Sequence, residues 1–161
     1  MKRWVRYVLL GNLLLFLLFF IFSIVKKEEI LSEGKLVLLK LAPVDPRSLM
    51  QGDYMTLRYD ITNNSFDTDI PRRGVCIVRL DEDGVASFVR YQKKPEGLAE
   101  DELPIEYTRQ DWRVTIGAES FFFQEGMGDK YDRAKYGGLR IDQKGNSVLV
   151  GLYDEKLKLI E

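Results

Sequence analysis

The chain has 161 residues and an almost balanced charge, with 24 Lys+Arg against 25 Asp+Glu. This length provides for one compact domain, and the charge balance excludes a basic nucleic-acid-binding protein. The single cysteine, Cys76, excludes an intrachain disulfide, and the lack of histidine excludes Ser-His-Asp catalysis and the usual His/Cys zinc sites. We therefore predict no metal ion and no cofactor.

The apolar segment 7–25 predicts a membrane-spanning helix. It contains no charged residue, and at about 1.5 Å per residue it extends over about 28 Å, close to the thickness of the hydrocarbon core of a bilayer. Lys2, Arg3 and Arg6 precede it, as in a signal peptide. However, the segment is longer than the apolar region of a signal peptide, and no small-residue cleavage site follows. We predict an uncleaved signal anchor over residues 1–25.

The side of the membrane on which the rest of the chain lies is predicted from length more than from charge. Basic residues stand on both sides of the apolar segment, with Lys26 and Lys27 directly after it. A short basic tail is readily retained in the cytoplasm, whereas a long domain is translocated largely regardless of its charge. We expect residues 26–34 to form a short stalk, helical at its start, and residues 35–161 to form an extracytoplasmic domain.

Beyond the stalk, the hydrophobic pattern has a period of two and predicts strands. The predicted strands are 35–42, 54–61, 74–80, 85–91, 105–108, 113–116, 139–142 and 147–152. Turn residues at 81–84 and 143–146 predict hairpins, residues 92–104 a surface loop, and residues 130–136 two helical turns. The fold class is mainly β: one N-terminal transmembrane helix, then one antiparallel β-barrel or β-sandwich-like domain with a short helix.

Two segments of this domain are candidates for a contact surface. Residues 45–54 contain an Asp-Pro turn and a Gly-Asp bend, and residues 119–131 combine carboxylates with the aromatic run Phe121 to Phe123. The candidate residues are Asp45, Arg47, Gly52, Asp53, Tyr54, Tyr59, Glu119, Phe122, Glu125, Tyr131 and Arg133. The alternatives are structural: the carboxylates bond backbone N–H groups or cap turns, and Phe121 and Phe123 fill the core while Phe122 points outward.

Residues 52–59 (GDYMTLRY) match the pattern that names the GDYXXLXY family, with Gly52, Asp53, Tyr54, Leu57 and Tyr59 at its fixed positions. Segments 45–48, 119–131 and 136–152 are also similar to what such proteins carry. The chain thus resembles this family over essentially its whole length. The resemblance implies a bacterial, membrane-anchored, extracytoplasmic protein, often encoded beside multi-pass membrane proteins. It implies no activity.

We expect a noncatalytic subunit at the bacterial cytoplasmic (inner) membrane, with its domain facing the periplasm or the cell exterior and docking onto a multi-pass membrane protein. The alternative is an envelope enzyme or small-ligand binder that acts on peptide or glycan through Glu119, Glu125 or Asp53. On a regular strand Glu119 and Glu125 would lie about 20 Å apart, too far for an acid and nucleophile pair. A self-associating structural domain is a third possibility.

Overall fold

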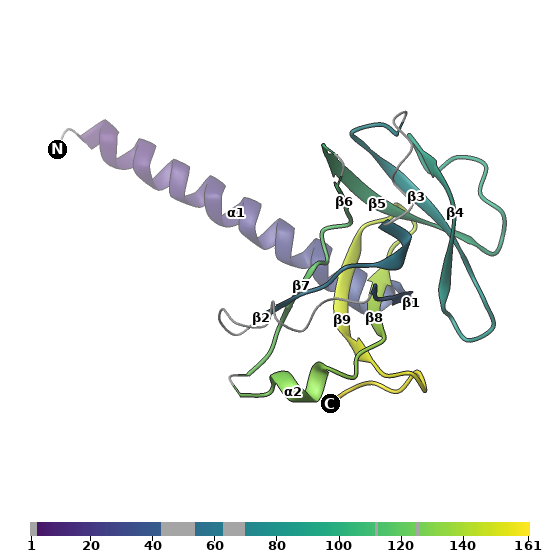
Figure 1. The fold of residues 1–161 in the computed structure, drawn as a ribbon. Helices are drawn as coiled ribbons and strands as arrows, with labels where there is room; N and C mark the ends of the chain where they lie inside the picture. The colour runs from purple at the N-terminus through teal and green to yellow at the C-terminus, as the bar shows by residue number, and fades with distance from the viewer. Residues whose placement is uncertain (1–2, 43–53, 63–69, 112, 125) are drawn as a thin grey trace.

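The computed structural model describes residues 3–42, 54–62, 70–111, 113–124 and 126–161 (Figure 1). A long helix, α1 (Arg3–Glu33), precedes the strands. The strands are β1 (Lys35–Lys40), β2 (Tyr54–Thr56), β3 (Arg73–Leu80), β4 (Ala86–Gln92), β5 (Glu102–Gln110), β6 (Arg113–Thr115), β7 (Ser120–Phe122), β8 (Tyr136–Ile141) and β9 (Ser147–Tyr153). A short helix, α2 (Gly128–Tyr131), lies between β7 and β8. The predicted class, mainly β with one N-terminal apolar helix and a short second helix, is confirmed.

Helix α1 projects away from the sheets (Figure 1). Its run of Leu, Phe and Ile contains no proline and no charge from residue 7 to 25, which allows an unbroken helix. It is long and apolar enough to cross a membrane, and the apolar part is not buried inside the protein. The helix continues through residues 26–33 and ends before Gly34, whose N–H donates to the carbonyl of Ile30 at 2.9 Å. The segment expected as a stalk is therefore the last two turns of α1.

The last turns of α1 pack on the β8–β9 hairpin. The side chain of Ile30 is buried, with 3% exposed. Arg140 in β8 donates to the carbonyl of Gly34 at 2.8 Å, and Lys26 Nζ lies 3.4 Å from Asn146 Oδ1 in the β8–β9 turn. A Cβ atom at Gly34 would lie 3.1 Å from the backbone nitrogen of Ile141, so the chain passes very close to β8 here. Helix and domain thus form one connected structure.

The strands form three antiparallel sheets, in the orders β1-β8-β9, β2-β7 and β4-β3-β5-β6. Single hydrogen bonds join them: Leu38 N–H donates to Gly84 O at 2.9 Å, and Glu106 N–H donates to Gly145 O at 2.8 Å. An antiparallel bridge between Leu41 and Tyr59 connects β1 to the segment after β2. The sheets enclose one core as a half-barrel.

Alternate residues of the strands fill this core, as the period of two requires. Fully buried side chains come from both large sheets and include Val37, Leu39, Cys76, Val78, Ile105, Leu139, Ile141 and Leu152. On β5 the intervening residue Glu106 is exposed. Burial of each such aliphatic side chain contributes about 1.5–3 kcal/mol to folding, so the shared core holds the three sheets together.

The hairpins expected at 81–84 and 143–146 are confirmed, and both use an aspartate in the same way. Asp81 Oδ1 accepts from the N–H groups of Asp83 and Val85, at 3.0 and 2.8 Å. Asp142 Oδ1 accepts from Lys144 and Asn146, at 2.9 and 2.8 Å. These bonds to the second and fourth following residues satisfy the turn backbone locally.

The expected strand 54–61 is wrong in its second half. Strand β2 ends at Thr56, and a 3₁₀ helix, η2 (Asp60–Thr62), follows. Thr62 stabilises this 3₁₀ turn, because its N–H and its hydroxyl both donate to the carbonyl of Tyr59, at 3.0 and 2.7 Å. The helix expected at 130–136 is also wrong in its extent, since α2 ends at Tyr131 and β8 begins at Tyr136.

Strands β5 and β8 both begin earlier than expected. In β5, Glu106 donates its N–H away from β3, to Gly145. Pro104, two residues earlier, has its nitrogen on that same edge, so the missing N–H costs no bond to β3. In β8, a Cβ atom at Gly137 would lie 2.9 Å from Cε1 of Tyr59, and one at Gly138 would collide with the ring of Tyr153. The glycines therefore leave room for two tyrosine rings rather than ending the strand.

Candidate functional site

The candidate contact surface is only partly covered by the described residues. Asp45, Arg47, Gly52, Asp53 and Glu125 lie outside them. The other six candidate residues are described: Tyr54 is in β2, Tyr59 follows β2, Glu119 directly precedes β7, Phe122 is in β7, Tyr131 is in α2 and Arg133 follows α2.

The structure pairs the strand that begins at Tyr54 with the predicted aromatic segment. Strand β2 pairs antiparallel with β7, and Tyr54 stands opposite Phe122 in the register. One residue beyond β2, the N–H of Leu57 donates to the carbonyl of Glu119 at 2.7 Å. Strands β2 and β7 thus lie side by side (Figure 1), although more than 60 residues separate Tyr54 from Phe122 in the sequence.

Tyr59 is fully buried and does not reach the surface on which we expected it. Its hydroxyl donates to the carbonyl of Ala118 at 2.6 Å. Burial raises the pKa of this phenol strongly, and the charge of Glu119 raises it further, so Tyr59 stays protonated as a donor. The last tyrosine of the motif therefore ties the segment after β2 to the segment before β7 from inside the core.

The side chain of Glu119 is used by the neighbouring backbone. Its Oε1 accepts from the N–H of Ile116 at 2.5 Å and closes a turn in which Gly117 has a φ of 78°. A positive φ strongly favours glycine, so the sequence Ile-Gly-Ala-Glu suits this turn. Glu119 thus bonds a backbone N–H group, which is the structural alternative to a role in a contact surface. Its half-buried carboxylate lies near the hydroxyl of Tyr59.

The aromatic residues after Glu119 divide between inside and outside as the alternation of a strand predicts. The rings of Phe121 and Phe123 both pack on Tyr131, with centroids 5.0 and 5.4 Å from its ring. Phe121 also packs against the core. Phe122 points the other way, with 73% of its side chain exposed. Arg133, after α2, is exposed as well.

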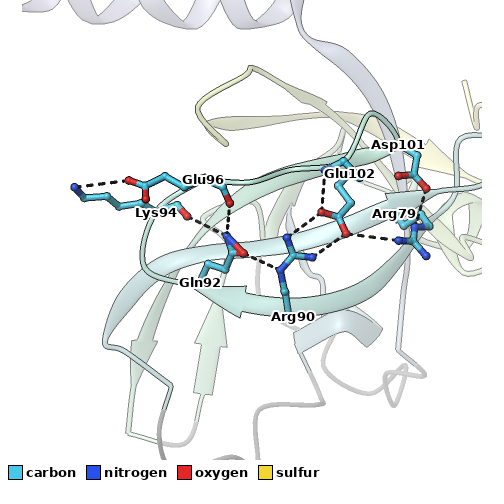
Figure 2. A network of polar contacts seen from close by, with 8 residues as sticks. Arg79, Arg90, Gln92, Lys94, Glu96, Asp101 and Glu102 are labelled. Atoms are coloured by element: carbon cyan, nitrogen blue, oxygen red, sulfur yellow. Dashed lines mark hydrogen bonds and ion pairs between the residues drawn. The ribbon is translucent and has the colours of Figure 1, made fainter.

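A polar network that was not anticipated lies on the β3-β4-β5 sheet (Figure 2). Arg90 in β4 forms two parallel bonds to the carboxylate of Glu102 in β5, at 2.7 and 2.9 Å. Its Nε donates to Gln92 Oε1 at 2.7 Å. Arg79 bonds Asp101 at 2.8 Å and lies 3.6 Å from Glu102. The guanidinium of Arg90 thus has carboxylate and amide acceptors on both sides.

This network fixes the loop 93–101 at both ends. Gln92 Nε2 donates to the carbonyls of Lys94 and Glu96, at 3.3 and 3.0 Å, and the N–H of Ala99 donates to Glu102 at 3.2 Å. The hydrogen bond from Arg90 is the main cause that lowers the pKa of Glu102, and the N–H of Ala99 lowers it further. This loop, which lies within the surface loop expected at 92–104, is pinned to the sheet in this structure.

The sequence does not predict this network, because only the register of the paired strands places its residues next to one another. Glu102 stands opposite Arg79 on paired strands, whereas Arg90 reaches Glu102 from the other side of the central strand β3. The charges alone do not reveal this, since the start of β5 at Glu102 was not predicted. A correct start for β5 would have placed Arg79 and Glu102 opposite each other.

The fold and the site together define a β-rich domain carried on an apolar helix that is long enough to cross a membrane. The chain belongs to the GDYXXLXY protein family, whose model matches residues 16–152. That match runs from within α1 to the penultimate residue of β9. No curated protein and no solved structure matches the chain.

Proposed function

We propose that this protein is a noncatalytic, membrane-anchored module that docks on a multi-pass membrane protein from the extracytoplasmic side of a bacterial inner membrane. The observation that carries the proposal is the unbroken connection between α1 and the domain. Residues 26–33 add about 12 Å of helix beyond the apolar segment, and this helix packs on β8–β9. The domain is therefore held close to the bilayer surface in one orientation.

A fixed height and orientation favour docking on another membrane protein. Confinement to the membrane raises the effective concentration of the domain near its partner, so that a modest interface suffices. A rigid junction also lowers the entropy lost on association, because the domain is already oriented.

The paired strands β2 and β7 supply the proposed contact surface. Phe122, the last residue of β7, is a large exposed aromatic side chain, and aromatic side chains are frequent anchors of protein interfaces. In the sequence, Gly52 and Asp53, the first two fixed residues of the family motif, directly precede β2. The carboxylate alternative loses support at Glu119, which is held by the turn backbone.

Affinity purification of the full-length protein at native expression, from membranes in mild detergent, tests this proposal. We expect a stoichiometric multi-pass protein to be recovered with the full chain and to be missing with an anchor of residues 1–34. Phe122→Ser should reduce the recovery of that protein at least about fivefold, as for loss of an interface anchor. The matched variant Leu36→Ser, at an exposed residue of β1, should leave it unchanged. Recovery of the same proteins with the anchor alone would overturn the proposal.

A further inference from the structure

A cation-rich groove of about 550 Å³ lies between the start of β3, the loop after β4, the β5–β6 pair and the β8–β9 turn. Its charged lining residues are Arg73, Lys93, Lys94, Lys144 and Glu106. Four cations and one carboxylate give the groove a net charge of 4 − 1 = +3. Residues 26–161 carry 24 − 3 = 21 Lys+Arg against 25 Asp+Glu, a net charge of −4. The groove is therefore positively charged, although the net charge of the domain that contains it is negative.

Hydrogen bonds hold the groove in place on three sides. The polar network of Figure 2 positions its loop side, because Gln92 bonds the carbonyl of Lys94 and is itself held by Arg90. Arg73 begins β3 and stands opposite Thr108 of β5. Lys144 precedes Gly145, whose carbonyl accepts from the N–H of Glu106 at 2.8 Å. Four separate parts of the chain therefore bring these charges together.

The positive charge of the groove is largely uncompensated by the protein. Over the residues that the structure describes, Arg73, Lys93 and Lys144 form no ion pair. Lys94 Nζ lies 4.0 Å from Glu96, with about three quarters of each side chain exposed, and an exposed pair of this length contributes little. An anionic ligand would therefore meet cations that have no competing carboxylate bound to them.

One lining residue of the groove, Lys144, lies close to the predicted membrane surface. Lys26 is the first residue after the apolar segment, and its Nζ contacts Asn146 in the β8–β9 turn. Lys144 is only two residues from Asn146, which is about 7 Å of extended chain at most. If α1 spans the bilayer, the β8–β9 turn lies near the lipid headgroups, and Lys144 brings the groove to that level.

We infer that this groove binds the phosphate group of an anionic membrane lipid. Lysine and arginine bind phosphate through charge-assisted hydrogen bonds, and the negative potential of an anionic membrane surface strengthens this attraction. The carboxylate of Glu106 supplies an acceptor for a hydroxyl, so a headgroup with both phosphate and hydroxyl, such as the glycerol headgroup of phosphatidylglycerol, suits the lining. The inference rests on α1 crossing the membrane and is independent of the proposed docking function.

Native mass spectrometry of the full-length protein in a neutral detergent tests the inference, with phosphatidylglycerol and phosphatidylcholine added separately. We expect phosphatidylglycerol to bind at least about tenfold more tightly. The variant Lys93→Gln/Lys94→Gln/Lys144→Gln should lose this preference. The matched variant Lys40→Gln/Lys156→Gln/Lys158→Gln removes three lysines that do not line the groove and should retain it.

Any of four results would overturn the lipid assignment. Equal affinity for the two lipids in the native protein, or an equal loss in both triple variants, would show that the groove does not select the headgroup. Calorimetric binding of inorganic phosphate that needs the groove lysines, without any lipid preference, would retain an anion site but assign it to a soluble ligand. If the groove variant loses only the co-purified membrane protein, while lipid binding is unchanged, the groove is a protein contact.

Discussion

At the scale of single residues, Glu102 is a carboxylate with only 5% of its side chain exposed. A buried charge is tolerated only when it is paired and hydrogen-bonded, and here Arg90 supplies both N–H groups of a bidentate pair. The same carboxylate accepts from Ala99 and so positions the loop that carries Lys93 and Lys94. One residue thus connects the β3-β4-β5 sheet to the cation-rich groove.

Replacing Glu102 with glutamine should lower the melting temperature at pH 7 by several degrees, because the amide cannot pair two oxygens with Arg90. The native pKa of Glu102 is lowered relative to the unfolded chain, first by the hydrogen bond from Arg90. The stabilisation is therefore present above the unfolded pKa of glutamate, about 4.3, and is lost as the pH falls through the lower native pKa. Thermal melts of both proteins from pH 7 downward should show the difference shrinking in that acidic range.

Glu96→Gln is the matched control for this experiment. Glu96 belongs to the same network, but about three quarters of its side chain is exposed and its partner Lys94 is 4.0 Å away. We expect its melting temperature to stay within about 1 °C of the native protein, as for a typical exposed pair. A difference for Glu102→Gln that does not change with pH would contradict the ionic origin of the stabilisation.

At the scale of elements, the junction of α1 with β8–β9 rests largely on Ile30. Ile30→Ala removes a buried side chain and should destabilise the packing of the helix end by about 2–4 kcal/mol. Limited trypsin digestion after Lys26 and Lys27 should become faster, and amide exchange over residues 28–34 should increase. The core of the domain lies elsewhere, so exchange in β3 and β5 should be unchanged.

Leu31→Ala provides the comparison, because Leu31 is the next residue of the same helix and has 45% of its side chain exposed. Its loss should change stability by less than about 0.5 kcal/mol. Equal protease sensitivity in both variants would mean that the helix end is not held by Ile30, and the rigid connection that carries the proposed function would then lose its main support.

The elements that sequence predicts best are those whose turns are stabilised locally. The β3–β4 and β8–β9 hairpins each contain an aspartate that bonds its own turn, so their chemistry is visible in consecutive residues. The bend after β2 and the early start of β8 depend instead on distant contacts. Tyr59 is held by Ala118 and covers Gly137, and neither neighbour is near it in the chain. Without those contacts, the alternation 54–61 favours a longer strand and the glycines favour a turn.

The functional residues likewise include some that the local sequence predicts and others that depend on distant contacts. Alternation along β7 predicts that Phe122 points outward, and the structure confirms it. The groove was not predicted, because Arg73, Lys93 and Lys144 are separated by 20 and 51 residues in the chain (93 − 73 and 144 − 93). Only the sheet order and the β8–β9 turn bring them together. The negative net charge of the whole domain conceals this local concentration of positive charge.

At the scale of the whole molecule, the side of the membrane on which the domain lies decides the docking proposal, and the single native cysteine makes that side measurable. Cys76 is buried in β3, with 2% exposed, and burial raises its pKa to about 12. Its thiolate fraction near pH 7 is therefore more than about a thousandfold below that of an exposed cysteine, whose pKa is about 8.5. Native Cys76 should not react with a maleimide until the protein is unfolded.

A cysteine introduced at the exposed residue Lys156 then reports the location of the domain without removing Cys76. In spheroplasts, the proposed extracytoplasmic location predicts that a membrane-impermeant maleimide labels Lys156→Cys fully. The same proposal predicts that Lys2→Cys is labelled only after the membrane is permeabilised, because a short basic tail is readily retained in the cytoplasm. The opposite pattern would place the domain in the cytoplasm. The extracytoplasmic docking proposal would then be wrong, whereas the lipid-binding groove would remain testable at the inner leaflet.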